Sequence, residues 1–159
     1  MNKRQQGLAT VEFSIIGLLM MIVLFAVVEF GRLVWMWNTL SEATRRGARA
    51  AVVCPVNDPA PANIAVFNAP DDNSANPVLT GLSPANVIVD YLDDTGTPTA
   101  VFADIHDVRV RITGYTFNLL VPILGTALAA PDFVTTLPRE SLGIIPEVAT
   151  PQCFASAGP

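Results

Sequence analysis

The chain has 159 residues, of which 51% are hydrophobic and only 14% charged, and its formal net charge is −5. Soluble domains are about one-quarter charged, so this composition favours a membrane protein or a subunit of a densely packed assembly. Most of the basic side chains lie in the first 50 residues, and the rest of the chain is acidic. The acidic remainder shows no basic face, which argues against nucleic-acid binding.

A short basic leader, residues 1–7, precedes a strongly apolar segment in which Phe13–Val28 carries no charge. With Leu8–Val11 before it and Phe30–Trp37 after it, the segment reaches the ~20 residues that span a bilayer. It exceeds the ~7–15 apolar residues of a cleavable secretory signal, and no small-residue cleavage site follows it. The sequence therefore predicts a membrane-spanning helix.

The basic residues Lys3 and Arg4 favour a cytoplasmic N-terminus. Arg45, Arg46 and Arg49 follow the span but lie well beyond its uncharged part, where the charge rule weakens. We therefore expect a single-pass membrane protein with its N-terminus in the cytoplasm and its C-terminal domain on the other side of the membrane.

The helical pattern continues past the apolar segment with charged pairs. Glu29 precedes Arg32 by three residues, and Glu42 precedes Arg45 and Arg46 by three and four. These spacings place opposite charges on one helix face, so both sets are predicted to form ion pairs.

Other features of the same helix concern packing. Trp35 and Trp37 suit the aromatic belt of a membrane interface, and ordinary packing explains them equally well. Gly47 and the alanines around it form a small-residue face that allows close approach of another helix or a sheet. Pro55 ends the helix because it lacks a backbone N–H and restricts the residue before it.

The predicted fold class is α+β, with a long N-terminal transmembrane and assembly helix followed by a small antiparallel β-sheet domain with long loops. Alternation of Val108, Val110 and Ile112 with polar residues predicts a strand with one buried face, and Gly114 marks a bulge. The predicted strands are Asn86–Leu92, Ala100–Ile105, Asp107–Leu120 and Phe133–Leu137, with short elements at Ile64–Phe67 and Pro77–Leu79 and a loop or short helix over Leu119–Ala130. The expected segments are a leader (1–7), the helix (8–54), a Pro/Asn/Asp-rich loop (55–85), the sheet domain (86–143) and an irregular tail (144–159).

The two cysteines, Cys54 and Cys153, have no metal-type spacing. In an exported domain a disulfide is the natural interpretation, with two separate buried thiols as the alternative. The disulfide would close a loop of roughly 100 residues and contribute about 4–5 kcal/mol in the chain-entropy model.

Enzyme motifs are absent from the sequence. The single histidine, His106, is flanked by Asp104 and Asp107, but alternation along a strand would separate these side chains. The oxygen-rich loops Asp71–Asn73 and Asp93–Asp94 do not fit the EF-hand spacing, and plain turn chemistry explains them better. We therefore predict no enzymatic activity, no cofactor and no metal site.

Glu12 is a lone carboxylate at the start of the apolar helix. A charge at the membrane centre costs ~2.5–3.5 kcal/mol on insertion scales, and less near the interface. Glu12 is either a boundary residue or a group that finds a cationic partner, such as the freed amino terminus of a neighbouring subunit, and sets axial register during assembly.

The stretch GLATVEF, the long apolar helix, EFGR and the downstream RRGARAA together resemble the TadE-like pseudopilins of tight-adherence (Flp-type) pili. In such prepilins a dedicated aspartic peptidase cuts after a glycine, and a glutamate occupies the fifth mature position. The resemblance implies cleavage between Gly7 and Leu8, with Glu12 in fifth place and Phe13 beside it. It covers about Gln6–Val53.

The resemblance implies a structural subunit, a minor pilin or pseudopilin for surface attachment. Its implied partners are other pilin subunits through the N-terminal helix, a prepilin peptidase, the inner-membrane assembly platform and the lipid bilayer. The helix would first anchor the subunit in the bacterial inner membrane, with the C-terminal domain in the periplasm, and then be extracted into the pilus. Two alternatives remain, a single-pass anchored periplasmic binding or scaffold protein and a secreted hydrolase-like domain with a cleaved signal.

Overall fold

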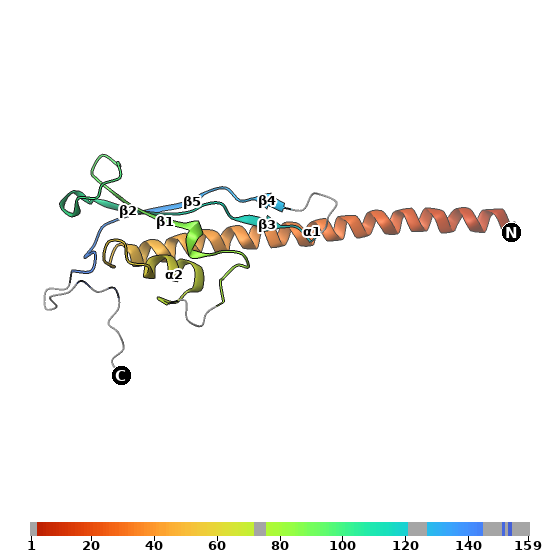
Figure 1. The fold of residues 1–159 in the computed structure, drawn as a ribbon. Helices are drawn as coiled ribbons and strands as arrows, with labels where there is room; N and C mark the ends of the chain where they lie inside the picture. Colours follow the sequence, from red (N-terminus) through yellow and green to blue (C-terminus); the bar gives the residue numbers. More distant parts are fainter. Residues whose placement is uncertain (1–2, 72–75, 121–126, 145–150, 152, 154–159) are drawn as a thin grey trace, which may run out of the picture. The chain divides into compact units, whose positions relative to one another are not determined.

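The computed structural model of the chain describes residues 3–71, 76–120, 127–144, 151 and 153, with side chains from Ala9 onward (Figure 1). A long helix precedes a set of short strands, which confirms the predicted α+β class. The regular elements are α1 (Lys3–Ala51), α2 (Ala60–Phe67), β1 (Val87–Leu92), β2 (Asp107–Ile112), β3 (Thr116–Asn118), β4 (Ala127–Ala129) and β5 (Phe133–Pro138), with 3₁₀ turns at Pro84–Asn86 and Phe102–Asp104.

The chain divides into two compact units, which are described separately. The helix–hairpin unit comprises residues 1–35 and 117–128, and the sheet unit comprises residues 36–116 and 129–159. Helix α1 has 49 residues and, at 1.5 Å per residue, is about 74 Å long. It begins at Lys3, within the predicted leader, and the chain leaves helical geometry shortly before Pro55.

Three strands of the sheet unit form an antiparallel sheet in the order β1-β2-β5. The buried side chains of β2 alternate with half-buried ones, as the sequence pattern predicts. On the wetter face, the Arg111 Nε donates to Asp90 Oδ2 at 2.9 Å across the β1–β2 pair. The opposite, apolar face of the sheet packs in the core.

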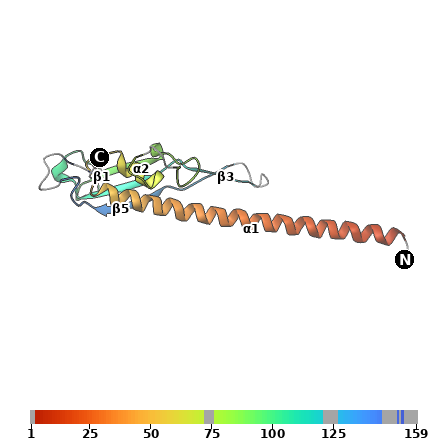
Figure 2. The same cartoon turned by 90° about the horizontal axis from the view of Figure 1, so that it is seen from below.

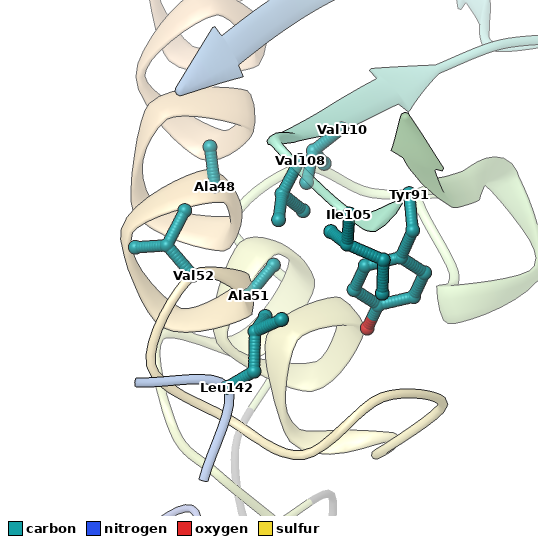
Figure 3. Close-up of a cluster of buried hydrophobic side chains, with 8 residues drawn as sticks. All are labelled: Ala48, Ala51, Val52, Tyr91, Ile105, Val108, Val110 and Leu142. Atoms are coloured by element: carbon teal, nitrogen blue, oxygen red, sulfur yellow. The ribbon is translucent and has the colours of Figure 1, made fainter. Parts of the chain in front are cut away.

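The core of the sheet unit joins the last turns of α1 to the apolar face of this sheet (Figure 3). Small side chains of α1 point toward β2, so helix and strand approach closely. Removing these side chains from water is the main stabilising term of the unit. The cluster consists of Ala48, Ala51, Val52, Tyr91, Ile105, Val108, Val110 and Leu142.

Helix α2 packs on α1 at Gly47 (Figure 2). A Cβ atom at Gly47 would lie 3.0 Å from Ala65 Cβ and 3.2 Å from the Pro61 carbonyl oxygen. The predicted small-residue face thus receives a helix at this position. The sequence suggested only a short element at Ile64–Phe67, but α2 begins at Ala60, whose N–H donates to Asp58 Oδ1 at 2.8 Å.

The prediction of a strand at Ala100–Ile105 is wrong, since a 3₁₀ turn occupies Phe102–Asp104. The chain pairs with β1 only as far as Thr99, whose N–H donates to the Tyr91 carbonyl at 2.9 Å. It then leaves the edge of β1 and forms the 3₁₀ turn before β2.

The predicted strand Asp107–Leu120 is divided in two. Gly114 adopts a φ of +67°, a left-handed conformation that turns the chain between β2 and β3. Strand β3 then pairs with β4 as a separate two-stranded hairpin. Part of the apolar segment Leu119–Ala130, predicted as a loop or short helix, therefore forms a strand, and residues 121–126 lie outside the described residues.

Candidate membrane and assembly helix

The first half of α1 carries an apolar surface that the described structure leaves uncovered. The helix is long and apolar enough to cross a membrane, and its most apolar 18-residue window is 0% buried. Large side chains point outward on every side, among them Val11, Phe13, Ile16, Leu18, Met21, Leu24, Phe25, Val27 and Val28. Leaving such side chains in water costs about 1.5–3 kcal/mol each relative to full burial. One such helix near the N-terminus is consistent with a single-pass membrane anchor.

The predicted processing and register residues lie at the start of this surface. Gly7 and Leu8 have helical backbone, and their side chains lie outside the described residues. Phe13 is 77% exposed, and the neighbouring Glu12 is exposed as well. No described cationic group forms an ion pair with Glu12.

Glu29 closes the uncharged run, and its side chain is buried inside the helix–hairpin unit. Its two carboxylate oxygens accept from Arg32 Nη1 at 2.8 and 3.0 Å. The backbone N–H of Leu120 also donates to Glu29 Oε1, at 3.3 Å. The Arg32 guanidinium lies 5.0 Å from the centre of the Phe117 ring. Glu29 and Arg32 thus join α1 to the β3–β4 hairpin. The sequence did not predict this contact, because Leu120 lies 91 residues after Glu29.

The second predicted set of ion pairs, Glu42 with Arg45 and Arg46, does not form. Among the described side chains, Glu42 makes no salt bridge with Arg45 or Arg46. Arg46 Nη1 instead donates to Asn68 Oδ1, at the C-terminal end of α2, at 3.1 Å. Glu42 and Arg45 are exposed, and exposed pairs gain too little to hold two long side chains together.

The two tryptophans have different surroundings. The Trp37 ring packs edge-on against Phe133 of β5, with ring centroids 5.5 Å apart and planes at 83°. Both residues belong to the sheet unit, so Trp37 packs on protein. Trp35 is 60% exposed.

The C-terminal end of α1 is held by a distant segment. The Val52 carbonyl accepts from the N–H groups of Glu140 and Leu142, both at 3.2 Å, and the Val53 carbonyl accepts from Gly143 N–H at 2.7 Å. Carbonyls at a helix end lack intrahelical partners, and these bonds supply them. We call the segment Glu140–Gly143 the helix clamp; no sequence pattern predicted it.

Cys54, in the turn that follows α1, is fully buried and disulfide-bonded to Cys153. The sequence separation is 99 residues, so the bond encloses almost everything that follows the helix. It ties the tail to the place where the helix clamp acts.

Among the remaining polar candidates, Asp93 shows turn chemistry, and Asp72 and Asn73 lie outside the described residues. Asp93 Oδ1 accepts from Thr95 N–H, Thr95 Oγ1 and Thr97 N–H, and the hydrogen bond from the Thr95 hydroxyl is the main reason that the pKa of Asp93 is lowered. His106 is exposed. Within the described ranges, no three His, Cys, Asp or Glu side chains gather as a metal site.

Comparison with known proteins gives one match. The family model of the TadE-like proteins matches residues 7–49, which comprise GLATVEF, the apolar run and the first part of the RRGARAA stretch. No curated protein and no solved structure matches the chain. Over residues 7–49, the N-terminal helix of this chain thus matches the TadE-like family, and this match suggests a protein related to tight-adherence pili.

Proposed function

We propose that this chain is a minor pilin or pseudopilin, a structural subunit in the assembly of a tight-adherence pilus that serves surface attachment. One observation carries the proposal, namely that the family match coincides with a helix whose apolar surface is exposed on all sides. Such a surface has two stable environments, a lipid bilayer and a bundle of similar helices. A subunit that moves from the first to the second needs this kind of helix.

Before assembly, α1 anchors the subunit in the inner membrane with its N-terminus in the cytoplasm. A prepilin peptidase then cuts between Gly7 and Leu8. Contact with the assembly platform draws the helix sideways into a pilus, where helices of other subunits replace lipid around the exposed side chains.

Glu12 gives this transfer its axial register. Its exposed carboxylate has no ion-pair partner among the described residues, and an unpaired charge in an apolar environment is costly. The amino group freed at Leu8 of a neighbouring subunit supplies the opposite charge. Only one axial offset between two helices brings these groups together.

The sheet unit remains outside the membrane as a contact surface. The helix clamp and the disulfide both join the C-terminal part of this unit to the end of α1. This construction suits a subunit whose domain must keep its shape while its helix changes surroundings.

Processing is the direct test of the proposal. Mass spectrometry of the protein from its own host should show an N-terminus at Leu8, and Gly7→Val should abolish it. Gly17→Val is the matched control, because Gly17 lies in the same helix with nothing within 4 Å of an added Cβ. An intact Met1 or Asn2 terminus in a peptidase-competent host contradicts the pilin role.

The same host separates the other candidate functions. An anchored periplasmic binding or scaffold protein would stay in carbonate-washed membranes, and its deletion would leave pilus assembly intact. A secreted domain would be recovered from the soluble fraction. The proposed pilin requires membrane retention together with loss of pili on deletion.

A further inference from the structure

The β3–β4 hairpin is held against α1 at one defined level of the helix (Figure 1). The Leu120 N–H donates to Glu29, and Phe117, only 6% exposed, lies under the Arg32 guanidinium. All four residues belong to the helix–hairpin unit. The hairpin is therefore attached beside residues 29–32 of α1.

This level coincides with the end of the membrane-crossing segment. The uncharged residues Phe13–Val28 cover about 24 Å of helix, and the hydrocarbon core is about 30 Å thick. With the N-terminal residues completing the span, Glu29 reaches the far boundary of the hydrocarbon. Three charge-assisted hydrogen bonds satisfy its carboxylate there.

The hairpin has the surface chemistry of a membrane contact. Leu120 is 71% exposed and Leu128 is 47% exposed. The sequence carries no charged residue between Arg111 and Asp132. By contrast, the wetter face of the three-stranded sheet carries an ion pair, Asp90–Arg111. An uncharged hairpin with exposed leucines beside the end of a span favours lipid over water.

We propose that the β3–β4 hairpin is a second membrane contact, in which Leu120 and Leu128 enter the outer boundary of the bilayer that α1 crosses. This inference rests on the proposed membrane span of α1. Its occupant is lipid rather than another protein, because the hairpin is attached where the apolar span ends, carries no charged residue, and lies at the level of Phe30, a further apolar side chain of α1 that is 69% exposed. The hairpin then sets how far α1 rises from the membrane, and it must leave the lipid when the subunit is extracted.

The test uses the full chain in vesicles of phosphatidylcholine and phosphatidylglycerol. Single variants Leu128→Cys, Leu18→Cys and Asp94→Cys each receive a nitroxide spin label, while the native cysteines stay in their disulfide. Collision of the label with oxygen reports lipid, and collision with a water-soluble nickel chelate reports water. Leu18 lies within the span and Asp94 lies on an exposed turn of the sheet unit, so they serve as references.

We expect Leu18 to favour oxygen strongly, Leu128 to favour oxygen at a shallower depth, and Asp94 to favour nickel. A label at Leu128 that favours nickel while Leu18 favours oxygen overturns the hairpin contact and leaves the membrane span standing. A label at Leu18 that favours nickel overturns the span and the hairpin contact with it.

A third outcome concerns another protein. A Leu128 label shielded from both reagents would mean that a second copy covers the hairpin, and would overturn the lipid contact. Leu120→Cys repeats the measurement on the β3 side, so one poorly folded variant does not leave the question open.

Discussion

Gly143 lies so close to Pro55 that a Cβ atom on Gly143 would fall 2.5 Å from Pro55 Cγ. Gly143 also has a φ of +80°, and its N–H donates to the Val53 carbonyl at 2.7 Å. The helix clamp thus meets the proline that ends α1 at a position where only glycine fits. This contact joins residues about 90 positions apart at the boundary between helix and domain.

The glycine requirement gives a stability prediction. Gly143→Ala should lower the free energy of unfolding by about 2–4 kcal/mol, because it combines left-handed backbone strain with a steric clash. Gly81→Ala is the matched control, since Gly81 has a φ of +86° but nothing within 4 Å of an added Cβ. It should cost about 1 kcal/mol. Urea unfolding of the detergent-solubilised protein measures both, and equal losses would show that contact with Pro55 is unimportant.

The link between Glu29 and the hairpin predicts a change in amide exchange. Glu29→Ala removes the acceptor of the Leu120 N–H and the partner of Arg32. Amide hydrogen exchange at Leu120 should become at least tenfold faster, since a hydrogen bond to a charged group contributes about 1.5–3 kcal/mol of stability. Glu42→Ala is the control, because Glu42 is exposed and makes no salt bridge. Unchanged exchange in the Glu29 variant would show that the contact does not hold the hairpin.

The disulfide between Cys54 and Cys153 predicts a thiol count and a stability loss. The exported protein, unfolded without reductant, should show no reactive thiol, and with reductant it should show two. Replacing both cysteines with alanine should lower the free energy of unfolding by about 2–5 kcal/mol, because the unfolded chain regains the freedom of a long loop. Two thiols before reduction would rule out the bond in the exported protein.

The register role of Glu12 predicts a defect in assembly alone. Glu12→Ala should insert into the membrane and be cleaved at Gly7, because removing a charge makes an apolar helix easier to insert. Its incorporation into pili should fall at least tenfold, as measured by immunoblot of sheared pili against the membrane fraction. Glu42→Ala, exposed on the same helix, should assemble normally. Normal assembly of the Glu12 variant would remove the register role.

Tyr91 predicts a loss of stability in alkali. Burial raises the pKa of Tyr91, although the Asn57 N–H bond to its oxygen opposes this in part. Because the folded-state pKa lies above the unfolded one, the stabilisation is complete below pH ~10 and is lost as the pH rises through the folded value. Tyr91→Phe should be less stable near neutral pH by about 0.5–1.5 kcal/mol, with a flatter alkaline decline. Equal alkaline declines in both proteins would assign the effect to other groups.

Local patterns in the sequence predicted the elements whose formation depends on near neighbours. Helix α1 follows from a long run without proline, and β2 follows from alternation between Val108 and Ile112. The Glu29–Arg32 pair follows from helical spacing. The strand expected at Ala100–Ile105 is wrong because the chain leaves the edge of β1 after Thr99 and forms a 3₁₀ turn at Phe102–Asp104, and a local pattern does not show whether a segment pairs with a neighbour.

By itself, the sequence determined the apolar helix and the α+β class, because each rests on composition or on contacts a few residues apart, and its N-terminal motifs carry the resemblance to TadE-like proteins. Only the tertiary structure decided where distant segments meet that helix. It brought Leu120 to Glu29, Ala65 to Gly47 and Gly143 to Pro55. Such contacts depend on the path of the whole chain. They are made by backbone N–H groups and glycines, and nothing in the sequence around one partner indicates which distant residue will be the other.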